Sequence, residues 1–184
     1  MKPLDRTLQQ IRGRMVRPYV TTRTRLLDIG CADGALFRQL GPIATYVGVD
    51  PEAPEAPAGP NARFIHDSFP TQALDPDERF DVIAMTAVLE HVPVRAQPEF
   101  ARACARHATP GCHLVVTVPS PAVDTILHML KRVSVADGMR DDQHYGFDPR
   151  ATPSVFEPAG FRLERHRRFE LGLNHLFVFR ARQS

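Results

Sequence analysis

Cysteine is scarce in this sequence of 184 residues, and long apolar runs are missing. The three cysteines are Cys31, Cys104 and Cys112, an odd number without metal-ligand spacing. No segment approaches the roughly 20 apolar residues that a membrane-spanning helix needs, and the first residues have no apolar core of the signal-peptide type. These absences predict a soluble, reduced, cytoplasmic protein with no metal site and no membrane span.

Excess charge is also small. The formal net charge is +2, and lysine occurs only at Lys2 and Lys131, so arginine carries almost all of the positive charge. This balance does not require a nucleic acid or an anionic membrane as a partner. The phosphate-binding pattern Gly-x-x-x-x-Gly-Lys is absent, which disfavours nucleotide hydrolysis. The length predicts a single domain, residues 1–184, that buries about two-thirds of its extended-chain surface.

A strand, a glycine loop and a helix are predicted at residues 25–40. Residues 26–29 read Leu-Leu-Asp-Ile, a short apolar run typical of a strand inside a parallel sheet. Gly30 and Gly34 follow, and residues 35–40 form helix before a Gly-Pro stop signal. Strand, loop and helix together place backbone N–H groups where a ligand can approach closely.

The residues inside this loop indicate which ligand it takes. A dinucleotide site has three glycines that admit a pyrophosphate, but here Ala32 replaces the middle glycine and two acids, Asp28 and Asp33, stand beside it. Carboxylates repel phosphates. They suit a ligand with an ammonium group and ribose hydroxyls, which describes S-adenosylmethionine.

Residues 27–34, Leu-Asp-Ile-Gly-Cys-Ala-Asp-Gly, resemble the first motif of the class I S-adenosylmethionine-dependent methyltransferases, within the small-molecule, UbiG-like group with type 11 or type 23 domains. Further motifs stand at residues 46–50, 80–92 and 110–119. The resemblance implies an α/β fold with three layers: a doubly wound, seven-stranded sheet, mostly parallel with an antiparallel last strand. It also implies S-adenosylmethionine as cofactor and S-adenosylhomocysteine as product.

The resemblance places the cofactor site along the carboxyl edge of this sheet. Asp50 ends the second strand at the spacing of one strand–helix–strand unit, where an acid accepts hydrogen bonds from both ribose hydroxyls. Asp67 and Ser68 follow the third strand, where the family contacts adenine. The complete predicted set is Asp28, Gly30, Cys31, Ala32, Asp33, Gly34, Asp50, Pro51, Asp67, Ser68, Thr86, Ala87 and His91.

Two other segments are predicted to adjoin the site. Residues 1–24 form an N-terminal helical segment whose apolar stripe packs on the sheet and from which Arg14 or Tyr19 can reach a ligand carboxylate. Residues 122–150 form a substrate-side cap insertion between the fifth and sixth strands. Prolines at 153 and 158 predict that the last helix is short or kinked.

Methyl transfer is an in-line substitution that depends on positioning and on exclusion of water, so a base helps only with a hydroxyl or a protonated amine. The catalytic candidates are His91 and His144, because histidine titrates near neutrality. The substrate-contact candidates are His91, Ser120, His144 and Tyr145. Cys31 is interpreted as a small packing residue.

The sequence favours transfer to a hydroxyl oxygen of a small molecule. Transfer to nitrogen or carbon stays open, although the Asn/Asp-Pro-Pro-aromatic signature of adenine- and glutamine-methylating enzymes is replaced by Thr86-Ala87-Val88-Leu89. A non-catalytic cofactor-binding or RNA-binding partner subunit is the alternative from another class. A thin cap also leaves room for a homodimer or another partner that completes the pocket.

Overall fold

A computed structural model describes residues 3–55, 59–120 and 148–182, with side chains from residue 9 onward. Seven strands form one sheet in the order β3-β2-β1-β4-β5-β7-β6. All neighbours pair in parallel except β7, which is antiparallel to both β5 and β6. This confirms the predicted sheet. The strands are β1 (Arg25–Ile29), β2 (Thr45–Val49), β3 (Ala62–Ile65), β4 (Phe80–Thr86), β5 (Ala108–Pro119), β6 (Phe161–Phe169) and β7 (Asn174–Ala181).

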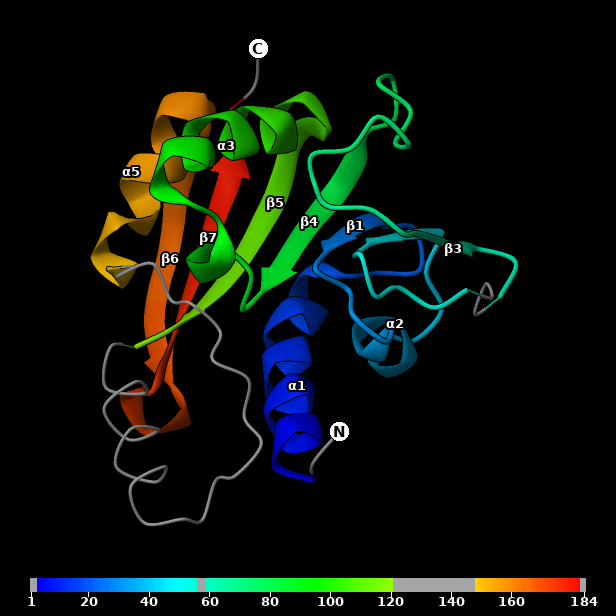
Figure 1. Ribbon diagram of the computed structural model, residues 1–184, viewed down its shortest axis with the longest axis horizontal. Coiled ribbons are helices and arrows are strands. Elements are labelled where there is room, and N and C mark those ends of the chain that lie inside the picture. The colour runs from blue at the N-terminus through cyan, green and yellow to red at the C-terminus, as the bar shows by residue number, and fades with distance from the viewer. Residues whose placement is uncertain (1–2, 56–58, 121–147, 183–184) are drawn as a thin grey trace.

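Helices cover both faces of the sheet (Figure 1). The α-helices are α1 (Pro3–Val16), α2 (Ala35–Gln39), α3 (Gln97–Arg106) and α5 (Thr152–Phe156). Short 3-10 turns are η1 (Arg17–Tyr19), η2 (Leu89–His91), η3 (Val94–Ala96), η4 (Pro149–Ala151), η5 (Glu157–Ala159) and η6 (Glu170–Gly172). Helix α5 has only five residues, as predicted: Pro153 stands in its first turn, where proline is tolerated, and Pro158 follows its end and cannot donate the next helical hydrogen bond.

Two apolar cores result from this layering. Alternate strand residues point to opposite faces, so one core joins the sheet to α3 and α5 through Phe100 and Phe156. The other joins it to α1 and α2 through Val16 and Leu36. The tyrosine of β2, Tyr46, is buried in this second core.

The N-terminal helix α1 lies beside α2 and the carboxyl ends of β4 and β5 (Figure 1). Gly13 lies against the Gln39 side chain of α2, because a Cβ at position 13 would lie 2.3 Å from the Gln39 Oε1 atom and would require this flexible side chain to move. The expected apolar stripe is described only in part, since the side chains of Leu4 and Leu8 lie outside the described residues.

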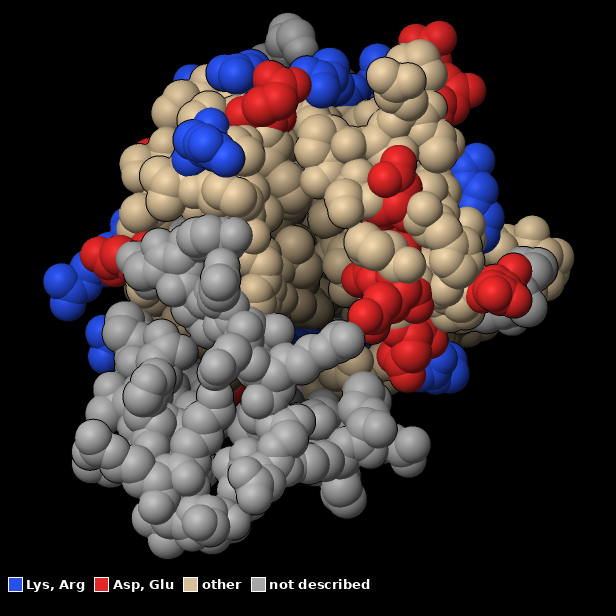
Figure 2. Space-filling model, viewed as in Figure 1, with Lys and Arg blue, Asp and Glu red and all other residues tan. Residues whose placement is uncertain are grey.

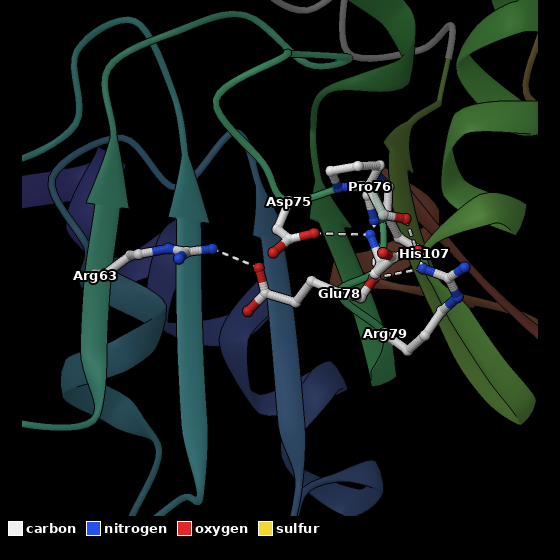
Figure 3. Close-up of polar contacts among 7 residues, drawn as sticks. Arg63, Asp75, Pro76, Glu78, Arg79 and His107 are labelled. Carbon is white, nitrogen blue, oxygen red and sulfur yellow. Dashed lines mark hydrogen bonds and ion pairs between the residues drawn. The ribbon is translucent and has the colours of Figure 1, made fainter.

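The far end of the sheet is held by the loop before β4 (Figure 3). Glu78 pairs with Arg63 of β3 through its carboxylate, and its carbonyl oxygen lies 2.9 Å from Nδ1 of His107. His107 caps α3 and is buried beside the Phe80 ring. These contacts fix the amino ends of the strands, opposite the edge that carries the site.

Candidate functional site

A cleft of about 750 Å³ lies along the carboxyl ends of β1, β2 and β4. Figure 2 shows it as a hollow with acidic side chains on one side. Clefts at this edge are where open α/β sheets bind ligands, and the volume is typical of small-molecule sites. The cleft also receives residues from α1 and α3, so both helical layers form its walls.

The structure brings most of the sequence-predicted cofactor residues to this cleft. The residues that line it are Asp28, Gly30, Cys31, Ala32, Asp50, Pro51, Asp67, Ser68, Thr86, Ala87 and His91. Asp33 and Gly34 do not line it; Asp33 instead pairs with Arg38 at 2.7 Å. Ser120 also lies outside the lining, and its N–H donates to the Leu173 carbonyl oxygen at 2.7 Å. His144 and Tyr145 lie outside the described residues.

The first loop has a tight, left-handed course. Gly30 has φ 75°, and a Cβ at this position would lie 2.3 Å from a methyl carbon of Val88. Glycine is therefore required both by conformation and by space. Ala32 also has a positive φ, 44°, a conformation that costs free energy for a residue with a Cβ.

The carboxylate of Asp50 is fixed at the floor of the cleft. Its Oδ2 accepts from the Ala32 N–H at 3.1 Å, and its Oδ1 accepts from the Glu52 N–H at 2.7 Å. A carboxylate has about four acceptor positions, so each oxygen retains capacity toward the cleft. This group is oriented in advance for a ligand with two adjacent hydroxyls.

The carboxyl group of Asp28 is buried and accepts a hydrogen bond from the Tyr46 hydroxyl. Desolvation by burial raises its pKa to about 7; the Tyr46 hydrogen bond opposes this rise and the nearby Asp50 charge adds to it. A cation in the cleft would favour the ionised form.

The exposed loop after β3 presents a third acid. Asp67 accepts from the hydroxyl of Thr71, and it also accepts from the Ser68 N–H at 2.7 Å. The Thr71 bond, followed by the Ser68 bond, lowers the pKa of Asp67. This carboxylate is ionised at neutral pH and oriented by its own loop.

Cys31 has the environment of a packing residue. Its side chain is buried against Gly48, where an added Cβ would lie 2.7 Å from the sulfur. Burial, followed by the charges of Asp28 and Asp50, raises the pKa of the thiol above its usual range. A thiol in this state is a poor nucleophile, which agrees with the interpretation from the sequence.

His91 ends the turn η2 at the mouth of the cleft and is exposed. Its backbone N–H donates to the Val88 carbonyl oxygen at 2.9 Å, which fixes the turn. Among the described residues, no group of three or more His, Cys, Asp or Glu side chains is arranged to hold a metal ion. None of the described helices meets the length and hydropathy needed to cross a membrane.

Helix α1 borders the cleft, as the sequence predicted for residues 1–24, but through other residues than Arg14 and Tyr19. Gln9, Arg12 and Gly13 line the cleft, whereas Arg14 is exposed outside it and Tyr19 packs its ring 4.9 Å from that of His113. The three lining residues stand at positions i, i+3 and i+4, which share one helix face. This spacing is visible in the sequence and indicates that the three residues face the same way. Arg14 lies on another face of the same helix.

Apolar residues missed by the sequence analysis form the other end of the cleft. Phe69 and Phe100 pack edge to face, with ring centroids 5.2 Å apart, and Val92 and Pro93 complete this wall. An apolar end beside the Asp67–Ser68 loop suits a flat aromatic base, while the acids and Arg12 suit a charged, hydroxylated portion.

Fold and cleft together define a class I S-adenosylmethionine-dependent methyltransferase. The sequence model of the family described as "Methyltransferase domain" matches residues 3–166. The chain therefore belongs to the methyltransferase domain family.

Curated relatives resemble one half of the chain. "Ubiquinone biosynthesis O-methyltransferase" of Bradyrhizobium sp. (strain ORS 278) is 39% identical over 102 residues, which cover 50% of this chain and 39% of that protein. The protein of the same name from Rhodopseudomonas palustris (strain BisB5) is 38% identical over 104 residues, 51% of this chain and 40% of that protein. The chain thus spans about two-fifths of the length of these relatives.

Solved structures show the same fold at low sequence identity. A putative methyltransferase in complex with the Haloferax volcanii Trm112 methyltransferase activator matches with TM-score 0.71 and 14% identity, over 98% of this chain and 92% of that chain. The Burkholderia thailandensis 1,6-didemethyltoxoflavin-N1-methyltransferase, solved with S-adenosylhomocysteine, matches with TM-score 0.70 and 18% identity, over 98% and 80%. N-methyltransferase NodS from Bradyrhizobium japonicum WM9 matches with TM-score 0.67 and 15% sequence identity, over 99% of this chain and 98% of that chain.

Proposed function

We infer that this enzyme transfers the methyl group of S-adenosylmethionine to a hydroxyl oxygen of a small molecule. The observation that carries the inference is the pair of oriented carboxylates, Asp28 and Asp50, on either side of the left-handed loop at Gly30. The O-methyltransferase name of the curated relatives supports oxygen as the acceptor atom.

The residues of the cleft fit this cofactor. Asp50 accepts from the ribose hydroxyls, and Asp28 faces the ammonium group. The Nε atom of Arg12 is buried and has no hydrogen-bond partner among the described residues, so it can donate to the amino-acid carboxylate. Asp67 and Ser68 meet the adenine edge. The acids make the cleft unsuited to a pyrophosphate.

The chemistry needs little covalent help from the protein. When bound, the sulfonium cofactor supplies an electrophilic methyl carbon and a neutral thioether as leaving group. The chain orients both reactants, and the apolar wall at Phe69 and Phe100 excludes water from one end. His91 accepts the proton that a hydroxyl acceptor loses. The earlier second candidate for this base, His144, stays a proposal from the sequence.

A single domain over residues 1–184 is part of the proposal, with a cap at 122–150 that holds the acceptor through His144 and Tyr145, and with Ser120, at the end of β5, as a further acceptor contact. A second copy or another protein can complete this cap. The activator bound to the Haloferax volcanii neighbour is one precedent for a partner of this fold.

Calorimetry with S-adenosylmethionine and S-adenosylhomocysteine tests the cofactor site. Asp50→Ala is expected to abolish binding and leave the fold intact. Asp75→Ala is the matched control, because Asp75 also accepts a backbone N–H two residues on, from Asp77 at 2.9 Å, but lies outside the cleft. Unchanged affinity in Asp50→Ala would contradict the ribose assignment.

Labelled methyl donor with alcohols, phenols and amines then tests the acceptor class. Turnover on a hydroxyl compound supports the proposal, and turnover on amines alone indicates N-methylation. Tight cofactor binding without turnover, together with salt-sensitive RNA binding, would instead support the non-catalytic partner subunit.

A further inference from the structure

Three buried polar atoms lie beyond the cofactor end of the cleft and use none of their hydrogen-bonding capacity among the described residues. They are Thr117 Oγ1, Glu170 Oε1 and Asn174 Oδ1. Thr117 and Asn174 are 0% and 3% exposed. Buried polar groups are nearly always paired, so three orphans in one region point to a missing ligand.

Strand register places these residues on one face. Thr117 pairs with Leu176 and Pro119 with Asn174, so Thr117 and Asn174 lie on the same side of the sheet. Leu176 belongs to the core under α1 and α2, so that side is the α1 side. On β4, Thr86 pairs with Thr117 and lines the cleft. The orphaned atoms of Thr117 and Asn174 therefore lie on the same face of the sheet as Thr86, on the strands next to the one that borders the cleft.

The turn η6 fixes Glu170 at this place. The Glu170 Oε2 atom accepts a hydrogen bond from the side-chain amide of Asn174. This leaves Glu170 Oε1 and Asn174 Oδ1 as neighbouring acceptors. The Ser120 N–H donates to the Leu173 carbonyl oxygen and ties the turn to the end of β5. Glu170 and Leu171 hold positive φ values of 50° and 55°, a strained conformation that this packing maintains.

The charges of Glu170 and Arg12 determine which kind of hydrogen-bond donor a ligand can place here. Burial raises the pKa of Glu170, while the charge of Arg12 and the Asn174 hydrogen bond oppose that rise. Arg12 already supplies a positive charge beside the carboxylate, so a second cation would be repelled. Two acceptors and a threonine hydroxyl therefore suit a neutral hydrogen-bond donor.

We propose that Glu170, Asn174 and Thr117 form a subsite that positions the acceptor by binding one of its neutral hydroxyl groups. This inference rests on the proposed methyl transfer and extends it, because it names the residues that select the acceptor. The three residues are positioning residues, and the reacting atoms stay at the cofactor end near Thr86 and His91.

Fluorine NMR titration can measure the selectivity of this subsite without knowledge of the natural acceptor. The probes are 4-fluorophenol and 4-fluorotoluene, which are matched in size, and 4-fluorobenzylamine, which is one atom longer and carries a cationic donor. Each is titrated with and without S-adenosylhomocysteine. We expect the phenol to bind about tenfold more tightly than the toluene, which corresponds to one hydrogen bond to a charged group, and more tightly than the amine.

Variants assign the selectivity to the subsite. Glu170→Ala and Asn174→Leu should reduce the preference for the phenol over the toluene to less than about twofold, and the isosteric Thr117→Val should weaken it without risk to the fold. Glu164→Gln on β6, an acid outside the cleft, is the control and should keep the preference. Calorimetry on Asn174→Leu and Thr117→Val should give unchanged affinity for S-adenosylhomocysteine; Glu170→Ala is left out of this comparison because Glu170 interacts with Arg12.

Equal binding of the phenol and the toluene, no binding of either, tighter binding of the amine, or a preference that survives in the variants would overturn the inference. These failures are distinct from failure of the proposed function, which would appear as loss of S-adenosylhomocysteine binding in the unmodified enzyme.

Discussion

The charge of Asp28 changes with pH in the working range. Its pKa of about 7 lies far above the ordinary value of 3.8. Between these values the folded protein keeps a proton that the unfolded chain has lost. Asp28 therefore contributes less to the free energy of unfolding as pH rises from about 4 to about 7. Above pH 7 the buried Asp28 carboxylate is charged, and this charge is compensated only when a cation occupies the cleft.

Asp28→Asn should separate stability from binding. The variant keeps an acceptor for Tyr46 and removes the charge, so at pH 8 its free energy of unfolding should exceed that of the unmodified protein by about 2 kcal/mol or more. At pH 4 the two should be similar. Urea unfolding at both pH values measures this difference.

The same titration should appear in cofactor affinity. Affinity for S-adenosylmethionine is expected to rise as pH increases through 7, because Asp28 ionises, and Asp28→Asn should remove this dependence. Calorimetry between pH 5.5 and 8.5 gives the comparison. A variant with the full pH dependence would show that another group is responsible.

Thr117→Val should stabilise the protein. The orphaned hydroxyl of Thr117 is replaced by a methyl group of equal size, so we expect a melting temperature a few degrees higher. Thr24→Val is the matched control: Thr24 is equally buried, but its hydroxyl accepts from the Thr21 N–H at 2.8 Å. The control should therefore melt at a lower temperature. A fall in both variants would mean that Thr117 is satisfied within the protein.

At the scale of elements, the loop after β1 depends on Gly30. Gly30→Ala combines a positive φ with a 2.3 Å approach to Val88, while Gly111→Ala has nearly the same φ, 76°, and nothing within 4 Å. The free energy of unfolding of the control, Gly111→Ala, should fall by about 1 kcal/mol from φ strain alone. That of Gly30→Ala should fall by at least about 2 kcal/mol more, and this variant should lose all cofactor binding.

A double variant checks the cause of this loss. Val88→Ala in the Gly30→Ala background removes the colliding methyl group, so it should recover part of the stability. Denaturant unfolding of both single variants and the double variant gives the coupling free energy. No recovery would place the strain in the backbone alone.

Helix α1 provides the only described arginine that lines the cleft. Arg12→Ala should weaken binding of S-adenosylmethionine by about 10- to 100-fold, because a charge-assisted hydrogen bond is lost. Arg14→Ala removes the same charge from the exposed side of the helix and should leave affinity within about twofold. Equal effects of the two variants would indicate a general influence of charge.

The elements could be predicted because their patterns are local. The apolar runs that contain Asp28 or precede Asp50, and the prolines near α5, each constrain a few neighbouring residues. The sheet and most of the cleft residues followed from the family resemblance of these local motifs. Predicting that Arg12 lines the cleft would have required knowing which face of α1 packs toward the sheet. Predicting the place of Glu170 would have required knowing that β7 pairs with β5, a contact between residues far apart in the sequence.

At the scale of the whole molecule, ligand binding should stabilise the fold through linkage. S-adenosylhomocysteine at 100 times its dissociation constant adds about 2.7 kcal/mol, which should raise the melting temperature by roughly 5 to 10 °C. Scanning fluorimetry measures the shift, and Asp50→Ala should show none. A shift of equal size in that variant would place the ligand elsewhere.

The reversed direction of β7 has a consequence for how this enzyme can change. Because β7 enters the sheet from the edge at which β5 ends, the turn η6 lies at the same edge of the sheet as the loops after β1 and β2, which line the cleft. Turns tolerate replacement better than strands do. If Glu170 positions the acceptor as we propose, grafting a different η6 segment should alter acceptor choice and leave the loops after β1 and β2 unmodified.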